Sequence, residues 1–349
     1  MLLVFILAGA LWALGAVLGA PRRLWLSMIG FLWAGVVLLH LVLPQTAPLR
    51  LATGGSAAPW LLLGGFAAVV LLYRAGLRRV RARAVAGEAP KEQSSRAFSD
   101  AELERYARHI ILREVGGPGQ RALKGASVLV IGAGGLGSPV MSYLAAAGVG
   151  TIGVIDDDEV DLSNLQRQVI HRDADIGTPK VHSAAAAVRA LNPHVQMRPY
   201  ARRLTDDIAA DLFAEYDMIL DGTDNFATRH LVNRTAVATG KPLISGALAQ
   251  WEGQLSVFDP ANGAPCYACI FPDIPAAGLA PSCAEAGVMG PLPGVIGAMM
   301  AGEAIKVITG AGTPLRGTLL IYDALYADAR RIQIKRRADC AVCGTKEAT

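Results

Sequence analysis

The chain has 349 residues, which exceeds one average domain but suits one large α/β domain plus an appendage. Its formal net charge is +4 and its mean hydropathy is +0.37, but residues 1–99 carry ten Lys and Arg against two Asp and Glu. The rest carries 23 against 27 and is mildly acidic, which argues against a nucleic-acid-binding domain.

Three apolar runs lie near the N-terminus, at residues 1–20, 24–43 and 57–73. Each is near the roughly 17–25 residues that a membrane-spanning helix needs. Arginines follow the first and third runs, whereas the connection between the second and third has only Arg50. Because basic residues are enriched on the cytoplasmic side, we expect a membrane anchor of three transmembrane helices in residues 1–83. The N-terminus would lie outside a bacterial inner membrane and the large domain in the cytoplasm.

Two alternatives to three spans stay open. The first run could be a cleaved signal peptide, although such a peptide begins with positive charge and the first charge here is Arg22. The third run is short enough for an interfacial helix. The first two runs contain no charge that would suggest transport, so we expect simple tethering. Residues 84–98 read as a linker to a domain at 99–349.

A soluble domain begins at residue 99, where Ser-Asp-Ala-Glu predicts a capped helix running to about Arg113. A β-branched run from Ser127 to Ile131 predicts a strand, and small residues from Ser138 to Ala147 predict a helix. The glycine loop between them offers a tight turn and backbone N–H groups for phosphate, and it contains Gly132, Gly134, Gly135 and Gly137. This order predicts a Rossmann-like, mostly parallel sheet with helices on both faces.

The next strand, Thr151 to Ile155, ends at Asp156, whose carboxylate can accept hydrogen bonds from ribose hydroxyls. The other acidic residues of that turn are interpreted as solvated. These features alone suit NAD as well as ATP.

Fixed cations farther along the chain favour a triphosphate. Arg167 and Lys180 could neutralise phosphate oxygens, and Asn164 could hydrogen-bond them. A strand at 217–220 then leads to Asp224, which could hold a Mg²⁺ that bridges phosphates. Capping the helix that begins at Phe226 is a compatible role for Asp224.

With these motifs the chain from about Tyr106 to Gly344 resembles the MoeB/ThiF/HesA family, relatives of the ubiquitin-activating enzymes. In that family the position of Arg108 reaches into the partner's ATP site, which implies a homodimer; His109 replaces the family's usual Gln. The resemblance implies binding of ATP and Mg²⁺ by Gly135, Asp156, Ser163, Asn164, Leu165, Gln166, Arg167, Lys180, Asp224 and Asn225.

The resemblance also implies an adenylyltransferase. The C-terminal carboxylate of a ubiquitin-like sulfur-carrier protein would attack the α-phosphorus of ATP and release pyrophosphate, in molybdopterin or thiamine biosynthesis. We expect a Gly-Gly carrier tail covered by residues 270–290, and a separate sulfur donor because no rhodanese domain follows. The open alternatives are an NAD-dependent oxidoreductase, a membrane-tethered binding module with a decayed site, and a tRNA-modifying dehydratase of the same family.

Four of the five cysteines form two Cys-x-x-Cys pairs, Cys266 with Cys269 and Cys340 with Cys343. They predict a structural zinc site of four thiolates, with two disulfides as the rival interpretation. The fifth, Cys283, is either a nucleophile, as in some relatives, or a passive loop residue. The six histidines show no ligand spacing and are interpreted as core or surface residues.

Overall fold

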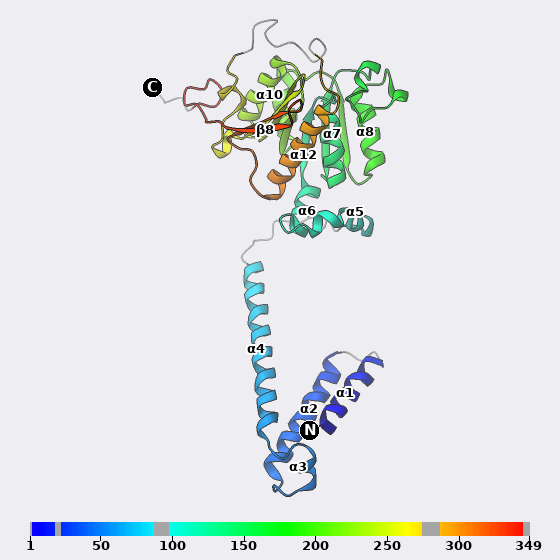
Figure 1. Ribbon diagram of the computed structural model, residues 1–349, viewed down its shortest axis with the longest axis vertical. Coiled ribbons are helices and arrows are strands. Elements are labelled where there is room, and N and C mark those ends of the chain that lie inside the picture. The colour runs from blue at the N-terminus through cyan, green and yellow to red at the C-terminus, as the bar shows by residue number, and fades with distance from the viewer. Residues whose placement is uncertain (1, 18–21, 87–97, 274–286, 345–349) are drawn as a thin grey trace. The chain divides into compact units, whose positions relative to one another are not determined.

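The computed structural model describes residues 2–17, 22–86, 98–273 and 287–344 (Figure 1). The chain divides into two compact units, Met1–Arg96 and Ala97–Thr349. Their boundary falls within residues 84–98, the stretch that the sequence marks as a linker.

The first unit is helical. It consists of α1 (Leu2–Val17), α2 (Arg22–Val42), α3 (Pro48–Ala52) and α4 (Ala58–Ala86). Val4, Val36 and Trp60 form a small buried cluster, and the Trp33 indole donates a hydrogen bond to the Trp60 carbonyl at 2.8 Å. Many other large apolar side chains are exposed, including Phe31 and Leu62.

The predicted three membrane spans are not supported by helix length and hydropathy. Among the described residues, one helix is long and apolar enough to cross a membrane, and it is α12 (Leu292–Thr309) of the second unit. That helix packs against α7 and β5 in the domain core. The apolar helical stretches of the first unit, Val4–Gly15, Ser27–Val42 and Ala58–Arg74, are shorter.

The second unit contains one eight-stranded sheet, counted over the described residues, in the order β3-β2-β1-β4-β5-β6-β7-β8. The five strands from β3 to β5 are parallel, and β5 to β8 are antiparallel. The mostly parallel α/β sheet predicted from the sequence is confirmed, with an antiparallel extension that was not predicted. The strands are β1 (Ser127–Ile131), β2 (Thr151–Asp156), β3 (Gln196–Ala201), β4 (Met218–Asp221), β5 (Leu243–Ala249), β6 (Glu252–Phe258), β7 (Thr318–Asp323) and β8 (Asp328–Gln333).

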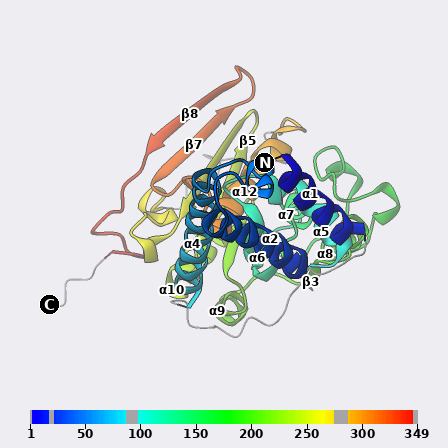
Figure 2. The same ribbon diagram turned by 90° about the horizontal axis from the view of Figure 1, so that it is seen from below.

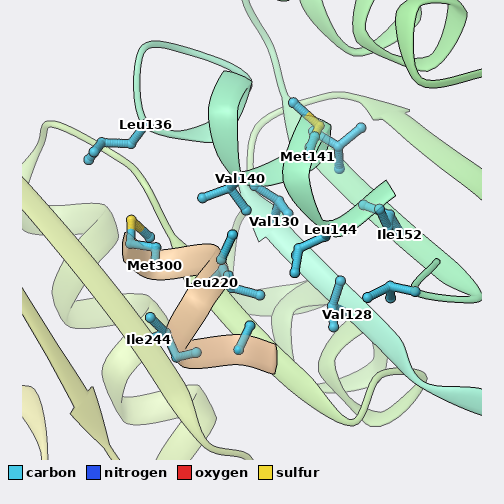
Figure 3. Close-up of a cluster of buried hydrophobic side chains, with 14 of the residues drawn as sticks. Val128, Val130, Leu136, Val140, Met141, Leu144, Ile152, Leu220, Ile244 and Met300 are labelled. Carbon is cyan, nitrogen blue, oxygen red and sulfur yellow. The ribbon is translucent and has the colours of Figure 1, made fainter. Parts of the chain in front are cut away.

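Helices cover both faces of the sheet. Strand β1 alternates between two hydrophobic clusters: Val130 joins Leu144 of α7 on one face (Figure 3), and Leu129 joins Phe213 of α9 on the other. This alternation follows from the period of two along a strand. The β7–β8 hairpin lies at one edge of the domain (Figure 2). The helices are α5 (Asp100–Ile111), α6 (Gly116–Gly125), α7 (Gly137–Ala147), α8 (Lys180–Leu191), α9 (Asp206–Ala214), α10 (Phe226–Ala238) and α12.

Short 3₁₀ turns η1 (Leu162–Asn164), η2 (Asp173–Asp175), η3 (Pro260–Asn262) and η4 (Tyr267–Cys269) complete the unit. The predicted capping box is present, because Ser99 Oγ accepts the Glu102 N–H at 3.3 Å and Glu102 Oε2 accepts the Ser99 N–H at 2.8 Å. The helix that it starts ends at Ile111, two residues before the predicted end, and α6 follows it.

Candidate nucleotide-binding site

The glycine loop connects β1 to α7 in a conformation that other residues would not fit. Gly132 has a φ of +93°, and a Cβ on Gly137 would lie 2.0 Å from the Gly132 carbonyl oxygen. A Cβ on Gly135 would lie 3.0 Å from the Pro293 Cβ at the start of α12. In the described part of the chain, the N–H groups of Gly134 and Gly135 have no hydrogen-bond acceptor. These donors precede the N-terminus of α7, an arrangement that suits phosphate oxygens.

The loop after β4 lies against the glycine loop. A Cβ on Gly132 would be 3.4 Å from the Gly222 carbonyl oxygen and 3.6 Å from Thr223 Cγ2. Strands β1 and β4 are neighbours, whereas the chain runs from β1 outward to β2 and β3 before it returns to β4. Open α/β sheets bind ligands at such a switch point, beyond the carboxyl ends of the strands.

Asp156, the predicted ribose acid, is the last residue of β2 and supports the glycine loop. Its Oδ2 accepts the Ala133 N–H at 2.7 Å, and its Oδ1 accepts the Asp158 N–H at 2.8 Å. Burial raises the pKa of Asp156, while these two N–H groups and the positive charge of Lys180 oppose the rise. Each carboxylate oxygen has two lone pairs, so the side chain retains acceptor capacity for ribose hydroxyls.

The run Ser163–Gln168 places a cation beside the glycine loop. The Arg167 Cγ lies 3.8 Å from where a Cβ on Gly135 would be. Its guanidinium donates to Asn164 Oδ1 at 2.9 Å and to the Ser163 carbonyl at 3.3 Å. Leu165 is half-buried, and Gln166 lies against Gly290 and is exposed. Arg167 is therefore oriented before any ligand binds.

Lys180 begins α8 and is 5% exposed. Its Nζ forms an ion pair with Asp158 Oδ2 at 2.7 Å, and its charge acts on Asp156. The Asp158 side chain is 65% exposed. Because the Asp158 carboxylate is exposed, it can return to solvent when a phosphate oxygen takes its place beside the ammonium.

Asp224 and Asn225 follow β4 on the loop that touches Gly132. The predicted helix cap belongs to Asn225, not Asp224: Asn225 Oδ1 accepts the Thr228 N–H at 2.8 Å. Asp224 is exposed, and no ion pair or hydrogen bond occupies its carboxylate within the described ranges. An accessible carboxylate at this sheet edge fits the oxygen chemistry that Mg²⁺ prefers.

Arg108 lies away from this site. It is exposed on α5, where the neighbouring Tyr106 packs beside Gly148 and accepts a hydrogen bond from Asn192 at 2.8 Å. Gly148 and Asn192 cap the C-terminal ends of α7 and α8. Helix α7 begins at the glycine loop and has 11 residues, so its ends are about 16 Å apart. Arg108 thus belongs to the opposite end of the strands from its own nucleotide site.

The four paired cysteines meet in one buried cluster, although Cys266 and Cys340 are 74 residues apart. Their sulfur atoms lie 3.9 Å (Cys266 to Cys269), 3.7 Å (Cys266 to Cys340) and 3.4 Å (Cys269 to Cys343) apart, and all four are free thiols. Disulfides are excluded in this structure. Four thiolates on tetrahedral zinc would be about 3.8 Å apart, so the cluster fits Zn²⁺.

The surroundings favour the thiolate at Cys340, whereas burial raises the pKa of Cys266 and of Cys269. Burial would raise the pKa of Cys340, but backbone N–H groups of Cys343 and Val342 and the neighbouring thiols outweigh it and lower the pKa to about 7. Cys283, the candidate nucleophile, lies outside the described residues, as does much of the predicted covering loop at 270–290.

Two buried residues near the site were not recognised in the sequence. His171 Nε2 lies 2.9 Å from the Ala133 carbonyl oxygen, and Arg229 donates to the Gly246 carbonyl at 2.6 Å and to the Thr223 carbonyl. His171 was interpreted only as a core or surface histidine. Neither residue stands in a motif whose spacing would reveal these contacts, which join separate loops.

Fold and site together define an α/β nucleotide-binding domain with its ligand site at the switch point of the sheet. The chain belongs to the ThiF family, whose profile matches residues 106–342. It is 51% identical over 251 residues to a sulfur carrier protein adenylyltransferase of Thermus thermophilus, covering 71% of this chain and 93% of that protein.

Two further relatives are longer than the matched region. The probable adenylyltransferase/sulfurtransferase MoeZ of Mycobacterium tuberculosis is 51% identical over 250 residues, which are 71% of this chain and 64% of MoeZ. The adenylyltransferase and sulfurtransferase MOCS3 of Sus scrofa is 47% identical over 251 residues, 72% of this chain and 55% of MOCS3. Among solved structures, Escherichia coli MccB with MccA-N7isoASN has a TM-score of 0.62 at 23% identity, covering 71% of this chain and 75% of MccB. At that identity the likeness concerns the fold alone.

Proposed function

We propose that this protein adenylates the C-terminal glycine of a ubiquitin-like sulfur-carrier protein, which prepares it for thiocarboxylate formation in molybdopterin or thiamine biosynthesis. The observation that carries the proposal is the gathering of Asp156, Arg167 and Lys180 around the glycine loop, in a chain whose relatives are named adenylyltransferases. A ribose acid followed by two cations suits a nucleoside triphosphate better than NAD, whose pyrophosphate carries less charge.

The reaction is in-line attack by the carrier carboxylate on the α-phosphorus of ATP, with pyrophosphate as the leaving group. The N–H groups of Gly134 and Gly135 bind phosphate oxygens, and Asp156 accepts the ribose hydroxyls. Arg167 and Lys180 stabilise the negative charge that develops on the transferred phosphoryl group. Preorganised charges of this kind usually make the largest contribution to catalysis.

Asp224 would hold Mg²⁺, which would offset the negative charge of the phosphates when bound. Asn225 keeps its amide N–H₂ for the ligand, because its carbonyl oxygen caps α10.

The enzyme acts as a homodimer in this proposal. Arg108 lies at the far end of α7 from its own glycine loop and is exposed, so it is available to complete the site of a second subunit. Each of the two sites then depends on both chains. The resemblance of Tyr106-Ala107-Arg108-His109 to the family motif supports this arrangement.

The N-terminal unit serves as a membrane tether, with the adenylation domain in the bacterial cytoplasm. Supporting observations are its exposed apolar side chains, such as Phe31 at 78% and Leu62 at 76%, and the arginines that follow the first and third apolar runs. Fractionation of cells that express the full chain, with carbonate and detergent washes, tests the tether. Release of the chain by carbonate alone would contradict it.

Zinc has a structural role in the proposal, since four thiolates leave no open coordination position. Sulfur comes from a separate donor. For Cys283, a change to Ala that preserves adenylate formation but blocks sulfur transfer would support covalent participation, and normal transfer would assign it a passive role.

The decisive experiment uses the full chain in detergent with a Gly-Gly-terminated carrier. We expect carrier-dependent exchange of labelled pyrophosphate into ATP and, by mass spectrometry, an adenylated carrier C-terminus. A carrier that lacks its last glycine is the matched control. Binding of NAD but not ATP by calorimetry would indicate an oxidoreductase, and exchange that depends on tRNA would indicate the dehydratase; either result would refute the proposal.

A further inference from the structure

His171 has a buried side chain that contacts the glycine loop at Ala133. It is 6% exposed, follows the run that carries Arg167, and contacts Ala133. Its Nε2 lies 2.9 Å from the Ala133 carbonyl oxygen, and its Nδ1 lies 2.9 Å from Ser183 Oγ on α8. Both ring nitrogens therefore have protein partners.

The protonation of the ring follows from those partners. A carbonyl oxygen can only accept, so Nε2 must carry a proton. Burial is the main cause that lowers the pKa of His171, and the nearby Lys180 lowers it further, whereas Ala133, Asp156 and Asp175 raise it. The net effect lowers the pKa of His171, and the carbonyl partner requires a proton on Nε2. The Ser183 hydroxyl, whose oxygen lies 2.9 Å from Nδ1, donates its one proton to Asp175 Oδ2 at 2.8 Å and is thereby held beside the ring.

The Ala133 backbone is thereby held on both sides. Its N–H donates to Asp156 Oδ2 at 2.7 Å, and its carbonyl accepts from His171 at 2.9 Å. Because a peptide unit is planar, fixing the Ala133 carbonyl also fixes the direction of the Gly134 N–H. That N–H and the one on Gly135 are the two donors that the proposed function assigns to phosphate oxygens.

We propose that His171 is a positioning residue of the nucleotide site, which sets the orientation of the Gly134 N–H group through the Ala133 carbonyl. The inference rests on the proposed function in one respect, which is that ATP is the ligand of this site. The link between His171 and the loop does not depend on the occupant, which allows the two to be tested separately.

The first test measures the loop itself in the full chain without nucleotide. Hydrogen exchange of a peptide that spans residues 132–137 reports how firmly the loop is held. We expect His171→Phe, which keeps a ring but removes the donor, to speed this exchange. His171→Gln, whose amide reaches as far as Nε2 and can donate to the carbonyl, should restore the wild-type rate. The matched control is His182→Gln, an exposed histidine on α8.

The second test measures ATP binding and turnover. Loss of one neutral hydrogen bond corresponds to about 3–10-fold weaker binding. We expect His171→Phe to raise the Kd and KM for ATP by that factor, with an unchanged KM for the carrier and a melting temperature near that of the wild type. His171→Gln should recover most of the loss. If His171→Phe does not fold, Ser183→Ala, which removes the partner of Nδ1, should give a smaller change in the same direction.

The outcomes distinguish a failure of the positioning role from a failure of the proposed function. Unchanged loop exchange in both His171→Phe and Ser183→Ala would overturn the positioning role, whatever ATP does. Faster exchange with equal losses for ATP and carrier would assign His171 a general structural role and also overturn it. If the wild-type chain bound no ATP, the proposed function would fail, and the exchange experiment alone would decide the role of His171.

Discussion

Replacing Arg229 by Met is expected to destabilise the domain and loosen the loop that bears Asp224. Arg229 is 5% exposed, and its Nη1 lies 3.7 Å from Oδ2 of Asp221, which is 1% exposed. The guanidinium also donates to the Ser245 hydroxyl at 3.0 Å, to the Gly246 carbonyl at 2.6 Å and to the Thr223 carbonyl. The substitution leaves a buried carboxylate without its cation and two buried carbonyl groups without their donor.

The size of the loss in stability depends on the hydrogen bonds that Asp221 keeps in the variant. Breaking a buried ion pair typically costs about 3–5 kcal/mol. Asp221 still accepts from the Thr223 N–H at 3.0 Å, the Thr223 hydroxyl at 2.7 Å and the Ser245 hydroxyl at 3.2 Å, so we expect the lower end, about 3 kcal/mol. For a domain of this size, that lowers Tm by about 6–12 °C. Pyrophosphate exchange should fall as well, because the Thr223 carbonyl adjoins Asp224.

Differential scanning fluorimetry of the full chain in detergent measures the shift. Arg234→Met is the matched control, since this arginine lies on the same helix in an exposed ion pair with Asp206 and should change stability by less than about 1 kcal/mol. The double variant with Asp221→Asn removes both charges and should recover at least half of the loss. A single variant that melts within about 2 °C of wild type, or a double variant no better than the single, would refute the reasoning.

Three other substitutions have definite expected outcomes. Asp224→Ala should abolish pyrophosphate exchange while leaving Tm unchanged, because the side chain is exposed and has no partner among the described residues; retained exchange would remove Asp224 from the mechanism. Gly137→Ala places a Cβ 2.0 Å from the Gly132 carbonyl oxygen. Calorimetry should show ATP binding that is at least tenfold weaker, by roughly 1.4 kcal/mol. The control variant Gly302→Ala, whose new Cβ has no atom within 4 Å, should bind ATP normally. Cys340→Ser should lower bound zinc, measured by atomic absorption, and expose residues near 340 to proteolysis; full zinc occupancy would contradict the four-thiolate site.

In the parallel half of the sheet, β1, β2 and β4 could be predicted because their signals are local, whereas β3 and β5 were not predicted. Strand β1 has the predicted bounds, and α7 begins one residue before its predicted start. The antiparallel half could not, since β8 (Asp-Ala-Arg-Arg-Ile-Gln) has all six residues exposed and pairs only with β7. Helix α6 was also missed. It contains four glycines and a proline, which favour a turn, yet Leu123 is fully buried in the core and the Gln120 side chain donates to the Ala147 carbonyl at 2.8 Å.

In the site, too, some residues could be predicted from local sequence and others could not. Asp156 and Asp224 follow strands, and the carboxyl ends of parallel strands meet at one edge, so their approximate places were predictable. The role of His171 depends on a contact with the glycine loop 38 residues away in sequence, and that of Arg229 on a contact with strand β5, 17 residues away. No local pattern encodes such contacts. The helix cap was assigned to Asp224 because both neighbouring residue types favour that position, and only the backbone conformation distinguishes Asn225.

Zinc held by the four cysteines would link Cys266 and Cys269 to Cys340 and Cys343, and would close the chain between the two pairs into a loop. The segment from Cys269 to Cys340 includes α12, β7 and β8, and the first turn of α12 brings Pro293 against the glycine loop. Closing a loop of this length restricts the unfolded chain, as a crosslink does, but a metal crosslink is reversible and its contribution grows with the concentration of free ion. With zinc bound there, the supply of zinc in the cell would affect the stability of α12, whose first turn lies against the glycine loop. Without zinc, α12 would be less stable even though the residues that contact ATP were unchanged.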